Sequence, residues 1–173
     1  MKPAPVTLPP LCAQRVGPEI ASRIVGVGDT ALLAEPLLGL IASRECPGCV
    51  LIETLDRVPE WVKAGRVIVS GFHSPLEQQV LRSVLRRNGR VVKVLARGMT
   101  EYRPAPDEHE SLAADHMLVI SAFAPSVTRL TRATALARNR LVLALASEII
   151  VPHVAAGSPL AALLAEVKHE RTN

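Results

Sequence analysis

The chain has 173 residues, the size of one compact domain, and 49% of them are apolar, which excludes a disordered tail. Only four residues are aromatic, so the core must be aliphatic, and binding of single strands by many stacked bases is disfavoured. The net charge of +4 is unevenly spread: residues 66–103 carry eight Lys or Arg and two acids, and residues 125–147 carry four Arg and no acid. Such blocks indicate a surface for phosphate or nucleic acid as readily as a solvated, arginine-rich face.

Membrane and secretory classes are disfavoured. The sequence contains no stretch of 18 uninterrupted apolar residues, which excludes a transmembrane span. No secretory signal is visible at the N-terminus. Three cysteines cannot form a disulfide framework, which fits a reducing compartment. We therefore expect a cytoplasmic protein with no membrane partner.

The first predicted elements follow a proline-rich beginning. Residues 1–18 are expected to be an irregular segment, and residues 19–173 a single domain. The near-continuous apolar run over residues 37–42 predicts a buried strand. A helix is predicted over residues 49–64, with Pro59 expected to break or kink it and Gly65 to end it.

The rest of the chain alternates strands and helices. A strand is predicted over residues 66–69, followed by a helix that Ser74 caps, with Pro75 at its first position and Glu77 completing a capping box. Further strands are predicted over residues 91–96, 117–123 and 149–154, a polar loop over 103–110, and helices over about 131–147 and after Ser158. Pro152 indicates that the last strand is an edge strand or ends early.

This alternation predicts a three-layer α/β/α, Rossmann-like fold with a mainly parallel sheet. Ligands of such sheets bind beyond the carboxyl ends of the strands. Mostly small, basic and glycine residues follow those ends. They are Ser43 and Arg44, Ser70 to His73, Arg97 and Gly98, Phe123 and Ala124, and His153 to Ser158. They are candidates to hold a phosphate, because small residues let the backbone approach it closely. In the alternative interpretation, Arg44 is an ordinary loop arginine and Gly71 belongs to a tight turn that needs glycine for its backbone angles.

Arg138, Asn139 and Arg140 place two guanidiniums on either side of an amide. On a helix, side chains two residues apart point about 200° away from each other. The two arginines could therefore face one ligand only in the first turn of a helix. Otherwise they form a surface patch.

Cys46 and Cys49 form a CxxC motif at a predicted helix N-terminus, a position that lowers a thiol pKa and suits redox chemistry. The motif is also half of a zinc site, but Cys12 is the only other thiol and no nearby histidine completes four ligands. Two incidental cysteines are the simpler interpretation. His73 and His153 both follow strands, yet the five histidines lack a metal-like spacing. No catalytic triad or carboxylate pair is legible, so we expect no enzyme, no cofactor and no metal.

A series of short motifs runs in fixed order between about residues 26 and 165. The most specific is ARNRLVLALAS over residues 137–147, which resembles RRNRIIAGLS. The others are Gly28-Asp29 with Leu32-Leu33 (resembling GN..LL), Ala42-Ser43-Arg44 (GSR), Val69-Ser70-Gly71 (VSG), residues 90–98 (GxTIAVLxxG), Ile120-Ser121-Ala122-Phe123 (LSEF) and residues 149–160 (VVVVEAxxxSGSL). Their order and spacing, over about four-fifths of the chain, resemble the Rossmann-like domain of the DNA-processing protein DprA (Smf) family.

The chain departs from this family pattern at several points. Ala42 replaces the glycine of GSR. The family motif SGxAxGID corresponds to residues 70–77, with Pro75 at its second glycine and Glu77 at its acid. Ala135 stands where an aromatic usually precedes RNR by three residues. The resemblance leads us to expect a minimal, divergent relative, without the family's further strand (KPVFAVPG), its N-terminal helical domain and its C-terminal winged helix.

The resemblance implies single-stranded DNA binding without catalysis, and delivery of that DNA to the RecA recombinase during recombination and natural transformation. It also raises a homodimer as an open expectation. Carried over by position, the phosphate- and DNA-binding candidates are Ser43, Arg44, Ser70, Gly71, His73, Arg138, Asn139, Arg140, Gly157 and Ser158. Arg82, Arg86 and Arg87 are auxiliary basic candidates.

Two other functions stay open at this point. Nucleoside-monophosphate phosphoribohydrolases have a similar fold and bind nucleotides, but their PGGxGTxxE loop corresponds to residues 155–159 here, without the matching Glu. This disfavours a hydrolase and leaves a nucleotide or nucleotide-derived ligand sensor. A redox protein built on Cys46 and Cys49 is the third hypothesis.

Overall fold

The structure is a computed structural model that describes residues 2–172, with side chains described to residue 169. In chain order its elements are β1 (Ala4–Pro5), α1 (Pro10–Val16), α2 (Pro18–Ala21), β2 (Val25–Gly28), η1 (Thr30–Ala34), β3 (Leu37–Leu40), α3 (Gly48–Lys63), β4 (Val67–Ser70), α4 (Pro75–Leu85), β5 (Arg90–Val94), η2 (Met99–Glu101), α5 (Pro106–Ala113), β6 (Met117–Ser121), α6 (Arg132–Leu145), β7 (Glu148–Ile150) and α7 (Pro159–Thr172).

The described strands form one sheet in the order β1-β2-β6-β5-β4-β3-β7. The five strands from β6 to β7 are parallel, whereas β2 pairs antiparallel with β6 and β1 antiparallel with β2. The central strands β3, β4 and β6 are buried along their whole length, which explains their continuous apolar sequences. The predicted mainly parallel sheet is therefore confirmed.

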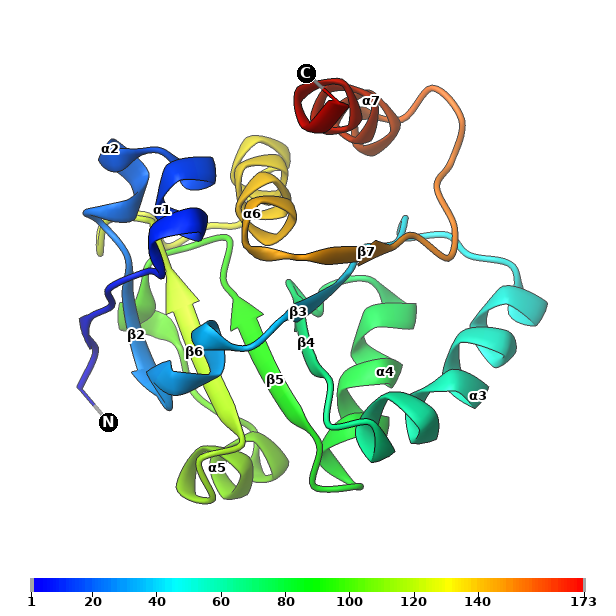
Figure 1. Cartoon of the computed structure of the whole chain (residues 1–173), viewed down its shortest axis with the longest axis horizontal. Coiled ribbons are helices and arrows are strands. Elements are labelled where there is room, and N and C mark those ends of the chain that lie inside the picture. Colours follow the sequence, from blue (N-terminus) through cyan, green and yellow to red (C-terminus); the bar gives the residue numbers. More distant parts are fainter. Residues whose placement is uncertain (1, 173) are drawn as a thin grey trace.

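Helices cover both faces of the sheet and make three layers. Helices α1, α6 and α7 lie on one face, and α3, α4 and α5 on the other (Figure 1). Leu141, Val142 and Leu163 belong to the core on the first face. Val58 and Val80 belong to the core on the second. The predicted α/β/α architecture is confirmed, and no helix within residues 2–172 is long and apolar enough to cross a membrane.

The structure differs from the sequence-based expectations at several places. The proline-rich beginning, expected to be irregular, contributes β1 and α1, and Val6 and Leu8 are buried in the core. Strand β2 was not expected at all. The segment expected to be a polar loop over residues 103–110 contains the start of α5. Helix α3 continues through Pro59 instead of breaking there. By contrast, β7 is an edge strand that ends before Pro152, as its sequence predicts.

Candidate functional site

The loops that follow β3 and β7 are bonded to each other at the carboxyl edge of the sheet. The backbone N–H of Ser43 donates to the carbonyl of His153 at 3.0 Å. The Ser43 hydroxyl in turn accepts from the backbone N–H of Ala155 at 2.9 Å. Ser43 thus joins two of the segments that the sequence predicts to hold a phosphate.

Glu77 organises the same edge from the first turn of α4. Its carboxylate is buried, and one oxygen accepts from the Ala42 N–H at 2.9 Å. The other oxygen accepts from the N–H groups of His73 and Ser74, at 2.8 and 3.2 Å. The predicted capping box with Ser74 is present. Its additional bond to Ala42, which ties the end of β3 to α4, was not predicted.

Arg138 on α6 lies directly against Gly71, the residue after β4. A side chain at position 71 would overlap the guanidinium, so the glycine is needed for this approach. Arg138 is 4% exposed, and its Nε has no hydrogen-bond partner among the described residues. Burial lowers the pKa of Arg138, while the negative charge of Glu77 acts in the opposite direction. A buried cation with an unused donor is costly unless an anion completes the site.

Arg44 and the protonatable side chain of His73 lie near the same space. The pKa of His73 is lowered, first by burial and then by the positive charges of Arg138 and Arg44, with Glu77 acting in the opposite direction. Arg44 is exposed, and His73 is partly exposed. Three cationic or protonatable groups, from three separate segments, therefore act on one another at the strand ends. We call Arg44, Gly71, His73 and Arg138 the strand-end cradle.

The turn after β4 is held in an uncommon conformation. Phe72 has a φ of 49°, in the left-handed region that bulky residues rarely adopt. The Ser70 hydroxyl accepts the N–H of Phe72 at 3.1 Å and is fully buried. Ser70, a predicted phosphate ligand, therefore supports the turn that carries Gly71 and His73.

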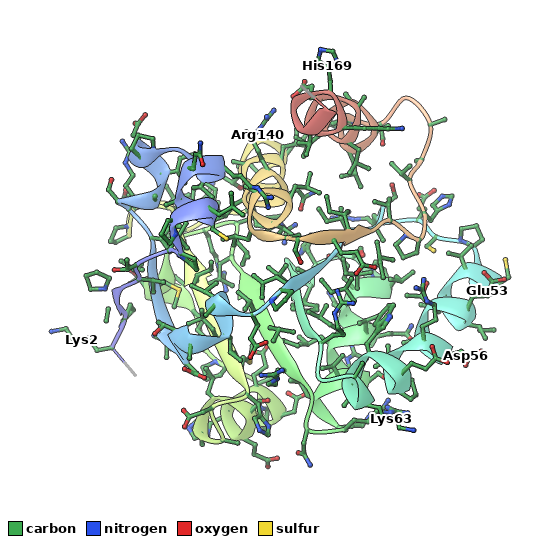
Figure 2. The ribbon with its side chains drawn as sticks, in the orientation of Figure 1. Lys2, Glu53, Asp56, Lys63, Arg140 and His169 are labelled. Carbon is green, nitrogen blue, oxygen red and sulfur yellow. The ribbon has the colours of Figure 1, made fainter. Side chains whose placement is uncertain are left out.

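The remaining candidates lie in less central positions. Arg140 points to another side of α6 than Arg138 and pairs with Glu166 of α7 at 2.5 Å; it is labelled in Figure 2. Asn139, between them, is partly buried. Ser158 accepts from the N–H of Ala161 in the first turn of α7. Gly157 has a φ of 68° and open space around it. The two arginines thus have different neighbours, but both line one cavity, so the expected separation is incomplete.

The auxiliary arginines do not reach the cradle. They lie in the second half of α4 and just beyond it, and α4 begins at the carboxyl edge of the sheet and runs toward the opposite edge. Arg82, Arg86 and Arg87 are exposed, and Arg87 donates to the carbonyl and hydroxyl of Ser83. These residues belong to a separate part of the surface.

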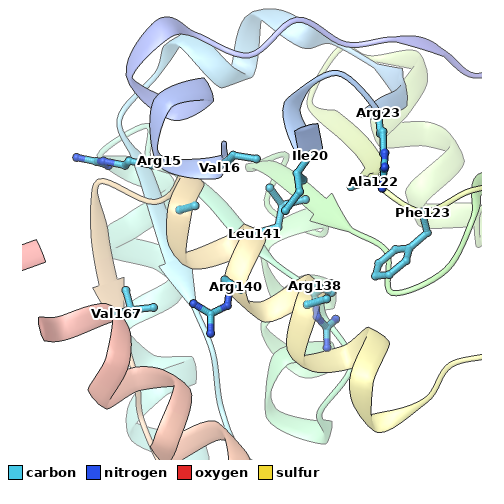
Figure 3. Close-up of a pocket in the computed structure, with 12 residues that line it drawn as sticks. Arg15, Val16, Ile20, Arg23, Ala122, Phe123, Arg138, Arg140, Leu141 and Val167 are labelled. Carbon is cyan, nitrogen blue, oxygen red and sulfur yellow. The ribbon is translucent and has the colours of Figure 1, made fainter. Parts of the chain in front are cut away.

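Two adjoining cavities, the first of them lined in part by Arg138 of the cradle, involve residues that were not among the predicted candidates. One, of about 770 Å³, lies between α1, α2, α6 and the end of β6, and its lining includes Arg15, Arg23 and Arg138 (Figure 3). The other, of about 1190 Å³, lies beside β2, η2 and the loop after β6. We call them the α6 cavity and the η2 cavity.

The cysteines do not gather into a metal site. No group of three or more metal-ligating side chains occurs among the described residues. Cys12 faces the carbonyl of Leu145, on the other face of the sheet from the core against which Cys46 packs. Burial raises the pKa of Cys46, and its neighbour Cys49 acts in the same direction. The helix N-terminus therefore does not give Cys46 the lowered pKa that the sequence suggested.

Residues 9–166 match the protein family described as DNA recombination-mediator protein A. No curated protein sequence matches the chain.

Two solved structures share the fold. The structure of DNA processing protein A (DprA) from Streptococcus pneumoniae superposes with a TM-score of 0.74 at 19% identity, over 94% of this chain and 56% of that one. The DNA processing protein A from Helicobacter pylori, described for its single-stranded DNA binding mode, gives a TM-score of 0.74 at 20% identity, over 97% of this chain and 78% of that one. The chain thus spans little more than half the length of the pneumococcal protein.

Proposed function

The chain belongs to the family of DNA recombination-mediator protein A, and from this premise we propose that its strand-end cradle binds single-stranded DNA through the phosphates. The observation that carries the proposal is the buried guanidinium of Arg138, whose Nε has no partner among the described residues. A phosphate oxygen is the acceptor that such a donor lacks, and guanidinium–phosphate pairs are strong, charge-assisted bonds.

The surroundings of Arg138 support an anion at this place. Gly71 lets the Arg138 guanidinium approach the end of β4 closely, and the positive charge of Arg44, from the loop after β3, acts on His73 beside it. Burial strengthens the attraction between these groups and a phosphate, because water screens it less. Contacts of this kind position a nucleic acid without reading its sequence. We therefore propose binding that depends strongly on salt and weakly on sequence.

The test compares two exposed arginines. Labelled single-stranded and duplex oligonucleotides are titrated with the wild-type protein, with Arg44→Ala and with Arg86→Ala, by fluorescence anisotropy at several salt concentrations. Each variant removes one exposed positive charge, but only Arg44 lies at the cradle. We expect the wild type to prefer the single strand. Arg44→Ala should weaken binding to every sequence and lower the salt slope by about 0.7, while Arg86→Ala should change little.

Two outcomes would contradict the proposal. Equal losses in Arg44→Ala and Arg86→Ala would mean that net charge, and not the cradle, attracts the DNA. A mononucleotide that displaces the oligonucleotide as strongly as a longer strand does would favour the nucleotide sensor instead. No catalysis is part of the proposal.

Two further expectations rest on the family resemblance alone. Delivery of the bound strand to RecA is tested by pull-down of RecA with the wild-type protein, with and without single-stranded DNA. Self-association is tested by light scattering of the same preparation. Failure of either would leave the phosphate cradle as proposed.

A further inference from the structure

The α6 cavity and the η2 cavity meet at one aromatic side chain. Phe123, Ala122 and Arg23 line both. Phe123 follows the end of β6, and Figure 3 shows its ring pointing into the α6 cavity, with Arg23 and Arg138 on either side in this view. The two cavities therefore adjoin at Phe123, and we call them together the groove; Arg138 is the cradle residue that lines it.

Phe123 differs from the other three aromatic residues of the chain. Trp61 and Phe72 are buried in the core. Tyr102 packs against that core and donates its hydroxyl to Glu108. Phe123 is partly exposed, and it is absent from both core clusters of the described residues. Tyr102 is also partly exposed and lines the η2 cavity, whereas Phe123 lines both cavities.

The groove around this ring is basic. Arg15, Arg23, Arg138 and Arg140 line the α6 cavity, and Lys2, Arg23 and Arg103 line the η2 cavity. Within the described residues, neither lining includes an Asp or a Glu, although the chain contains 16 acids. Exposed acids such as Glu53 and Asp56 project from α3, at the side of the molecule opposite Lys2 (Figure 2). Two of these arginines also pair with an acid outside the cavity linings, Arg23 with Glu19 and Arg140 with Glu166, and both arginine side chains remain about half exposed or more. The excess of basic side chains in the linings complements a polyanion on both sides of Phe123.

The backbone holds Phe123 in place before any ligand arrives. The Ser121 hydroxyl accepts the Phe123 N–H at 3.1 Å and donates to the Arg97 carbonyl at 2.7 Å. The Gly98 N–H donates to the carbonyl of Val127 at 2.8 Å, which ties the loop after β6 to the end of β5. A backbone held in this way loses little conformational freedom when a flat group stacks on the ring that it carries.

We propose that Phe123 is a stacking platform for one nucleobase of the bound strand. The phosphates on one side of that base lie at Arg138 and Arg44, and those on the other side lie at Arg23 and Arg103. The inference rests on the proposed function and extends it from phosphate capture to a path of several nucleotides. A single platform also fits a chain so poor in aromatic residues, because stacking contributes at one step while phosphates supply the remaining contacts.

The test separates stacking from charge. The wild type, Phe123→Leu and Phe123→Tyr are titrated with an oligo-dT of about 12 nucleotides and with an abasic oligomer of equal length and charge. We expect Phe123→Leu to weaken oligo-dT binding about tenfold, with an unchanged salt slope and unchanged affinity for the abasic oligomer. Phe123→Tyr should keep most of the affinity. Thermal melting of each variant checks that it is folded.

Different failures have different meanings. If the wild type binds oligo-dT and Phe123→Leu binds it equally well, the platform is wrong and the cradle stands. If Phe123→Leu loses affinity equally for oligo-dT and for the abasic oligomer, Phe123 shapes the groove and does not stack on a base. If the wild type binds no oligonucleotide at low salt, the proposed function fails and this inference fails with it.

Discussion

The guanidinium of Arg138 occupies the place where a side chain at position 71 would be, so Gly71 and Arg138 form one steric unit. Gly71 is not among the glycines with positive φ, and its role is therefore space and not backbone freedom. The unit joins α6 to the end of β4. It also explains why the motif over residues 137–147 and the turn at Ser70 and Gly71 belong to one site, although Gly71 and Arg138 are about 67 residues apart in the chain.

Gly71→Ala should displace Arg138 and weaken single-stranded DNA binding together with stability. The added methyl group has no room, so we expect a loss of about 1–3 kcal/mol in the free energy of unfolding, measured by urea denaturation. Gly48→Ala is the matched control, because a methyl group there meets nothing within 4 Å. In the double variant with Arg138→Met, the cost of the added methyl group should largely disappear. If the effects of the two substitutions on stability are additive in the double variant, the overlap between the methyl group and Arg138 is not the cause of the lost stability.

Arg138→Met should abolish most DNA binding and change the stability of the free protein little. Arg138 is 4% exposed and carries an Nε without a partner among the described residues. An apolar side chain of similar size removes the desolvation penalty of this charge, but it also leaves the buried Glu77 carboxylate without the nearby guanidinium. We expect the two effects to offset each other to within about 1 kcal/mol, measured by thermal melting without DNA. A loss of about 3 kcal/mol or more would mean that Arg138 mainly compensates the charge of Glu77 in the fold.

How much of this site the sequence could predict depends on how local each signal is. The cap of α4 uses neighbouring residues, and the Ser74–Glu77 box was predicted correctly. The start of α5 carries a comparable signal, with Pro106 at its first position and Asp107 and Glu108 in its first turn. The polarity of that segment nevertheless led to the prediction of a loop, so a usable local signal was missed there.

Other features depend on partners far away in the chain. Strand β2, with two glycines in four residues, has little strand preference of its own and forms because it pairs with β6. The bond from Glu77 to Ala42 spans 35 residues. The cavities beside Phe123 arise where α1, α6 and the end of β6 come together. The pattern of apolar and polar residues along the chain does not reveal contacts between distant segments. The predicted candidates therefore included Arg138 but not Arg23 or Phe123.

His73 should make DNA binding stronger at lower pH. Its pKa is lowered from 6.5 by burial and by Arg138 and Arg44, so the free protein holds it mostly neutral at pH 7. A phosphate in the cradle opposes those causes and raises the pKa again, and binding then takes up a proton. We expect affinity to rise between pH 8 and pH 6, and the rise to be smaller in His73→Gln. If the affinity of the wild type and of His73→Gln changes equally with pH, the group that takes up the proton is not His73.

The same pKa shift predicts the opposite effect on the stability of the free protein. As pH falls through 6.5, the unfolded chain protonates His73 before the folded protein does, so stability decreases. The difference between the wild type and His73→Gln in urea denaturation at pH 7 and pH 5 isolates this contribution. NMR titration of the His73 imidazole, without and with oligo-dT, measures the shift directly.

Glu77→Gln should damage the cradle without touching a residue that contacts the DNA. The carboxylate accepts three backbone N–H bonds, from Ala42, His73 and Ser74, and a glutamine can accept with only one of its two terminal atoms. At least one N–H would lose its partner, and Arg138 would lose its nearby negative charge. We expect a loss of about 1–3 kcal/mol in the free energy of unfolding, together with weaker DNA binding.

Hydrogen exchange should become faster at the Ala42 and His73 amides of Glu77→Gln. Glu53→Gln is the control: Glu53 is an exposed acid on α3, and its replacement should leave both amides protected. Unchanged exchange at Ala42 in Glu77→Gln would mean that the loop after β3 is held by Ser43 and His153 alone.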